Sequence, residues 1–143
     1  MSDIKDFVIE DGVLEEYTGN DAEVVIPEGV TSIGDSAFSG CTNLTAITIP
    51  DSVTSIGNYA FGECTKLTTI TIPDSVTSIG GNAFWGCKGL ADKKGFVIIN
   101  GTLYYYCGFE KNVVIPEGVT SIGGAFEYCE KCSKSTFFGT VFY

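Results

Sequence analysis

The sequence predicts a β-rich repeat protein of the α/β repeat class, a right-handed solenoid of about four 23-residue coils with two β-hairpin units. Three observations predict this fold. Nearly the same nine residues, IPEGVTSIG or IPDSVTSIG, occur four times, beginning at Ile26, Ile49, Ile72 and Ile115. The first three copies are 23 residues apart and align without a gap. A longer unit also occurs twice, from Phe7 and from Phe96, and each copy leads directly into the nine-residue phrase.

The 23-residue period places side chains of one kind in fixed columns, and it lies in the range of leucine-rich repeats. Because one repeat cannot bury these side chains alone, we expect stacked coils to turn each column into a continuous ladder. The cysteine column is interpreted as core packing, since a small soft side chain fills space beside Phe and Leu. The columns are Val30, Val53 and Val76; Ile33, Ile56 and Ile79; Phe38, Phe61 and Phe84; Cys41, Cys64 and Cys87; and Leu44, Leu67 and Leu90.

Within each coil, the segments LTAITIP and LTTITIP alternate between apolar and small polar residues, which is typical of strands. The apolar residues are expected to face inward and the threonines outward. Pro50 and Pro73 end the strands, because proline lacks the backbone donor that a ladder needs. Gly57 and Gly80 are expected to allow a corner with unusual backbone angles.

The two longer units each contain a two-residue hairpin turn, Asp11-Gly12 in the first and Asn100-Gly101 in the second, because these residue pairs tolerate positive φ. The two copies differ in charge. A terminal hairpin must tolerate water, whereas an internal one can lie against the preceding coils. This difference explains a substitution pattern in which Glu10, Glu15 and Glu16 correspond to Ile99, Tyr104 and Tyr105.

The chain of residues 1–143 is predicted to be one domain. It divides into an N-terminal hairpin cap at 7–25, three coils at 26–90, an internal hairpin at 96–114, and a fourth coil with an irregular cap at 115–143. The fourth copy is one residue shorter than the third between its Ile-Gly and its cysteine. The last residues, SKSTFFGTVFY, either close the stack as a strand or remain free, in which case self-association is expected.

Composition excludes several classes of function. The chain has no histidine and no arginine, and its formal net charge is −10. The usual general base and the bidentate anion clamp are therefore missing, and no basic stripe exists for nucleic acid. We predict no catalytic residue, no metal site and no cofactor. No apolar run is long enough for membrane insertion, and the opening MSDIKDF lacks the apolar region of a signal peptide.

The repeat LTAITIPDSVTSIGNYAFGEC closely resembles the BspA-like, or Treponema-type, leucine-rich repeat, over roughly Phe7 to Cys129. The resemblance implies a binding module rather than a catalyst. It further implies an adhesin-like protein on a bacterial cell surface, or secreted, that binds host or extracellular-matrix proteins. The alternatives that the residues leave open are carbohydrate binding and a purely structural spacer.

The outer strand face is the predicted partner-binding surface, because the regular face of a repeat protein commonly binds partners. It carries Thr48, Thr69 and Thr71. Tyr104, Tyr105 and Tyr106 are predicted to add an aromatic hot spot, since such side chains bury large areas at modest entropic cost. The alternative is that the tyrosines pack the second hairpin against the coils.

Overall fold

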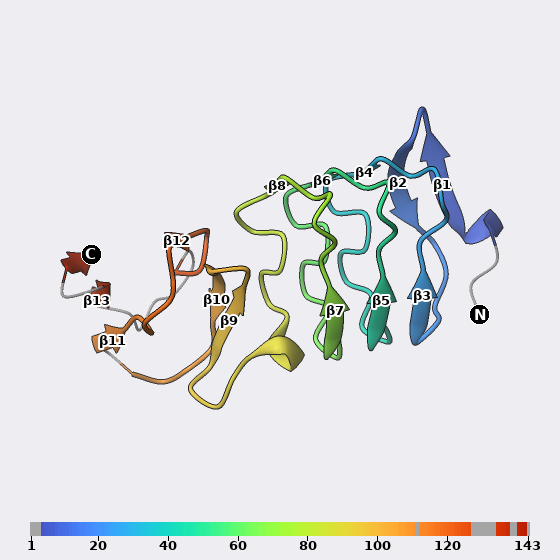
Figure 1. Ribbon diagram of the computed structural model, residues 1–143. Helices are drawn as coiled ribbons and strands as arrows, with labels where there is room; N and C mark the ends of the chain where they lie inside the picture. The colour runs from blue at the N-terminus through green and yellow to red at the C-terminus, as the bar shows by residue number, and fades with distance from the viewer. Residues whose placement is uncertain (1–3, 111, 127–133, 138–139, 143) are drawn as a thin grey trace.

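The computed structural model describes residues 4–110, 112–126, 134–137 and 140–142, and side chains within 4–110 and 113–126. These residues form a leucine-rich-repeat β-solenoid (Figure 1). Apart from strands and turns, the described residues form two single turns of 3-10 helix, η1 (Ile4–Asp6) and η2 (Lys88–Leu90). The predicted fold class is confirmed.

Longer and shorter strands alternate along residues 23–79, three of each kind. The longer strands β3 (Glu23–Val25), β5 (Ala46–Thr48) and β7 (Thr69–Thr71) pair in parallel, and Val24, Ile47 and Ile70 lie opposite one another. The shorter strands are β4 (Ser32–Ile33), β6 (Ser55–Ile56) and β8 (Ser78–Ile79), which also pair in parallel. Residues 23 apart are therefore directly stacked, as the period predicts.

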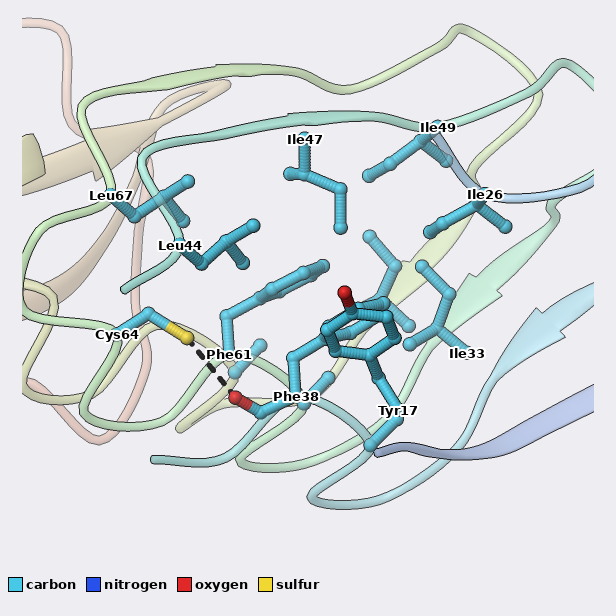
Figure 2. Packing of buried hydrophobic residues seen from close by; sticks show 14 of the residues in the cluster. Tyr17, Ile26, Ile33, Phe38, Leu44, Ile47, Ile49, Phe61, Cys64 and Leu67 are labelled. Atoms are coloured by element: carbon cyan, nitrogen blue, oxygen red, sulfur yellow. Dashed lines mark hydrogen bonds between the residues drawn. The ribbon is translucent and has the colours of Figure 1, made fainter. Parts of the chain in front are cut away.

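The core is a set of ladders in which like side chains pack on like. Phe38 and Phe61 have ring centroids 5.3 Å apart, and Phe61 and Phe84 have theirs 5.4 Å apart; all three rings are fully buried. Figure 2 shows Phe38 and Phe61 beside Tyr17, which stacks on Phe38 from the first hairpin at 5.3 Å. The thiols of the cysteine column lie in the same interior, and Cys64 Sγ donates a hydrogen bond to the carbonyl oxygen of Phe38 at 3.1 Å (Figure 2).

The glycine that ends each nine-residue phrase is required for a reason other than the predicted one. Neither Gly57 nor Gly80 has a positive φ. A Cβ atom on Gly57 would lie 2.6 Å from the backbone nitrogen of Asp35, and one on Gly80 would lie 2.6 Å from Cα of Asn58. The prediction of unusual backbone angles is wrong, because the constraint is the close approach of consecutive coils.

The second strand of each hairpin pairs in parallel with a short strand that follows it in the chain. Strands β1 (Phe7–Glu10) and β2 (Val13–Tyr17) are antiparallel, and β2 pairs in parallel with β4. Strands β9 (Phe96–Ile99) and β10 (Thr102–Tyr106) repeat this arrangement, with β10 parallel to β12 (Ser121–Ile122). The second strand of each hairpin thus occupies the place of a short strand in a coil. The predicted turns are confirmed, because all four turn residues have positive φ.

The second hairpin joins two hydrophobic cores. A register shift in β10 between Leu103 and Tyr105 places both Leu103 and Tyr104 in the interior. Leu103 belongs to the core of the fourth coil, whereas Tyr104 belongs to the core of the first three coils. The corresponding residue of the terminal hairpin, Glu15, is exposed. The predicted contrast between a hydrated terminal cap and a packed internal hairpin is confirmed.

The last described strands of the chain form a three-stranded sheet. Strand β11 (Asn112–Val114) pairs in parallel with β13 (Lys134–Phe137), which pairs antiparallel with β14 (Thr140–Phe142). Asn112 lies opposite Lys134, 22 residues later, which matches the shortened fourth copy. Because β13 begins a further turn, the solenoid has about five turns instead of the predicted four. Self-association through this tail stays a prediction.

Candidate functional site

The predicted strand face is solvent-exposed. Thr48, Thr69 and Thr71, here called the threonine face, point outward from β5 and β7, while Ile47, which precedes Thr48, is buried in the core. Alternation along a strand causes this separation, since successive side chains point to opposite faces. The threonine face lines a shallow cleft of about 310 Å³. The other lining residues are Ala46, Ile47, Ile49, Asp51 and Pro73.

One edge of this face is open. Among the strands that the structure describes, β7 pairs only with β5. Ile70 and Ile72 are consequently half-buried, whereas their counterparts Ile47 and Ile49 are 4% and 7% exposed. The threonine face therefore borders a strip of apolar side chains next to unpaired backbone donors and acceptors.

The described strands of the second hairpin do not pair with β7, and their ring contacts with the third coil are to Phe84 and Trp85. Tyr104 meets the ring of Phe84 edge-on at 5.2 Å, and Tyr105 meets Trp85 edge-on at 5.3 Å. Phe84 and Trp85 belong to the turn segment of the third coil, residues 81–86, so both contacts lie on the side of the coil formed by the turns, here called the turn side. Nothing in the described residues stacks on the strand side of the third coil in the way that β7 stacks on β5.

The structure corrects the prediction of an aromatic hot spot. Tyr104 and Tyr106 are only 3% and 5% exposed, and they pack against Phe84 and against Phe96 and Phe126. The Tyr106 hydroxyl accepts a hydrogen bond from the backbone N–H of Glu110 at 3.0 Å. Tyr105 is half-buried beside Trp85. The alternative, that the tyrosines hold the hairpin in place, accounts for these contacts.

Four titratable groups of the described interior have shifted pKa values. Burial raises the pKa of Cys41 to about 11, with the charge of Cys64 as a second cause. A hydrogen bond with Cys87, followed by burial, raises the pKa of Cys64. Burial also raises the pKa values of Tyr104 and Tyr105. At neutral pH Cys41 and Cys64 are therefore protonated, which makes these two thiols poor nucleophiles.

A second cleft was missed by the sequence predictions. It has a volume of about 720 Å³ and lies between the segment that follows η2, the end of the second hairpin, and β11. Three segments distant in the sequence build it, so no local motif indicates it. The one local signal is the Lys93-Lys94 pair in a strongly acidic chain.

The comparisons with known proteins agree with this architecture. A sequence profile of the BspA type leucine rich repeat region, which contains 6 copies, matches residues 9–131 and 97–141. The chain belongs to the BspA-type leucine-rich-repeat family. Members of the leucine-rich-repeat class typically act in protein interactions and are typically not enzymes.

Solved structures of other leucine-rich-repeat proteins share the fold. A leucine-rich-repeat protein of Treponema pallidum is 32% identical with a TM-score of 0.66, and the match covers 94% of this chain and 70% of that one. One from Bacteroides ovatus is 34% identical with a TM-score of 0.56, covering 92% of this chain but only 41% of that one. No curated protein matches the chain.

The described residues were compared with what a metal site and a membrane-spanning helix require. Within the described residues, no group of three or more His, Cys, Asp or Glu side chains is arranged to hold a metal ion. The part of the chain that the structure describes also contains no helix with the length and apolar character needed to cross a bilayer.

Proposed function

We propose that the chain is a non-catalytic protein-interaction module of an adhesin-like protein, displayed at a bacterial cell surface or secreted, that binds a host or extracellular-matrix protein. The observation that carries this proposal is the threonine face bordered by the open edge of β7. Half-buried isoleucines beside exposed hydroxyl groups form the combination of apolar centre and polar rim that protein interfaces use.

The open strand edge favours a protein partner over a carbohydrate. An unpaired strand can accept an extended segment of another protein, whose main chain supplies hydrogen bonds while alternate side chains fill the apolar positions. Ile70 and Ile72 offer such positions on β7. A carbohydrate site built on the tyrosines would instead need accessible aromatic faces, and Tyr104 and Tyr106 are buried.

The rigidity of the stack supports binding. The strands of this face are held by parallel pairing from β3 through β7 and by the buried ladders behind them. A surface that is already ordered loses little conformational freedom when a partner binds, so more of the contact free energy appears as affinity.

Capture by immobilised fibronectin, laminin and collagen, measured by biolayer interferometry, tests the proposal. Changing Thr48→Glu and Thr71→Glu together should weaken capture by the matrix protein that binds at least tenfold, about 1.4 kcal/mol, because two charges would be buried against the partner. Both threonines are exposed and make no side-chain hydrogen bond within the described residues, so the fold should be unaffected.

The matched control is Thr42→Glu with Thr65→Glu. These threonines are also exposed and also stacked 23 residues apart, but they lie on the turn side of the coils. The control should bind as the unchanged chain does. Equal affinity of the Thr48→Glu, Thr71→Glu variant would contradict the site, and failure of the unchanged chain to bind any of these proteins would favour a spacer role.

A further inference from the structure

The cleft of about 720 Å³ behind the second hairpin carries an unusual local charge. It is here called the lysine cleft, after Lys88, Lys93 and Lys94 in its wall. These are three of only eight basic residues in a chain with a net charge of −10. All three are exposed, and among the described residues none lies within 4.0 Å of a carboxylate oxygen.

The carboxylates of the cleft offset only part of this charge. Asp92 and Glu110 are the acidic residues that line it. One oxygen of Asp92 is already engaged, because it accepts hydrogen bonds from the backbone N–H groups of Lys94 at 2.9 Å and Phe96 at 3.1 Å. These bonds fix the turn that presents Lys93 and Lys94. Three lysines against two carboxylates leave the described lining of the cleft with a small excess of positive charge on a protein whose net charge is −10.

The same cleft exposes apolar surface. Phe109 at its rim is 87% exposed and Val114 on β11 is 68% exposed. The first hairpin has Asn20 at the position that corresponds to Phe109, so the aromatic side chain is a feature of the second copy alone. Cations and apolar side chains that share one concave surface suit a ligand with carboxylates and apolar groups close together.

Strand β11 adds a main-chain element to the cleft. Among the described strands it pairs only with β13, so its other edge, beside Val113 and Val114, has no strand partner. An extended peptide could pair with this edge by strand addition, with alternate side chains directed at the lysines and at the apolar rim.

We propose that the lysine cleft binds an acidic, extended protein segment in which carboxylate side chains alternate with aromatic or aliphatic ones. A nucleic acid fits less well, because its phosphates would use the lysines but its sugar-phosphate backbone cannot add as a strand to the edge of β11. A sulfated glycan would use the lysines but neither the exposed Phe109 nor the edge of β11. This site is separate from the threonine face and does not depend on the proposed function.

Fluorescence anisotropy with a labelled peptide of alternating Glu and Phe tests the proposal. The unchanged chain should bind it saturably, and binding should weaken as salt screens the charges. A peptide with Gln in place of every Glu, and heparin as a sulfated glycan, should bind at least tenfold more weakly. The absence of saturable binding up to about 1 mM peptide would overturn the proposal.

Matched charge reversals locate the site. Lys93→Glu should weaken peptide binding at least tenfold, whereas Lys66→Glu, which makes the same charge change at an exposed position outside the cleft, should change it less than twofold. Phe109→Ala should weaken the Glu-Phe peptide but leave a polyglutamate peptide unaffected. Equal effects of Lys93→Glu and Lys66→Glu, or tighter binding of heparin than of the peptide, would overturn the proposal.

Discussion

Phe61→Ala should lower the free energy of unfolding by about 3–5 kcal/mol, which is a large part of the stability of a domain of this size. Phe61 is fully buried between Phe38 and Phe84, and its ring is within 10° of parallel to both. Removing it leaves a cavity inside the ladder, and both neighbouring rings lose a stacking partner. Urea unfolding followed by far-UV circular dichroism measures the change.

Two variants serve as controls for Phe61→Ala. Phe61→Leu keeps most of the apolar volume and should cost roughly 1–2 kcal/mol. Thr65→Ala alters an exposed position of the same coil and should stay within about 0.5 kcal/mol of the unchanged chain. A loss below about 1 kcal/mol for Phe61→Ala would show that the ring does not occupy a packed interior.

Tyr104→Glu should also destabilise the chain, by about 3–5 kcal/mol at pH 8, because it places a carboxylate without a partner against Phe84. The substitution copies the terminal hairpin, which has Glu15 at the corresponding position. There the carboxylate is exposed to water, whereas the Tyr104 side chain is 3% exposed. The fluorescence of Trp85, the single tryptophan, reports unfolding next to this contact.

The pH dependence of the free energy of unfolding distinguishes the effect of the buried carboxylate charge in Tyr104→Glu from the effect of losing the tyrosine ring. Burial raises the folded-state pKa of a carboxyl above its unfolded value, so stability is retained at low pH and lost as pH rises through the folded pKa. Tyr104→Glu should thus be closer to the unchanged chain at pH 4 than at pH 8. Tyr104→Gln should lack this dependence, and Tyr104→Phe should cost little. A pH-independent loss for Tyr104→Glu would mean that the side chain reaches water.

Sequence alone predicted the parts of the fold that repetition specifies. Three copies of a phenylalanine or a valine at one spacing determine which side chains stack, and Asn100-Gly101 specifies a turn that few other residue pairs adopt. Position-by-position comparison of the two hairpins also predicted which of them is buried. These inferences needed only patterns that are local or periodic.

The candidate sites depended on tertiary contacts that the pattern does not contain. Simple alternation along β10 would separate Leu103 from Tyr104, but the register shift buries both, and so the tyrosines were misplaced. Whether a strand of the second hairpin pairs with β7 depends on how the hairpin packs against the third coil. The open edge of β7 and the lysine cleft both follow from that packing.

The most direct test of the stacked solenoid is nuclear Overhauser spectroscopy on a chain with isotope-labelled phenylalanine rings. Residues 23 apart should give ring-to-ring cross-peaks between Phe38 and Phe61 and between Phe61 and Phe84, whose centroids are 5.3 and 5.4 Å apart. Phe38 and Phe84, two coils apart, should give none. Loss of the first two cross-peaks, or a cross-peak between Phe38 and Phe84, would contradict the stacking on which both binding surfaces depend.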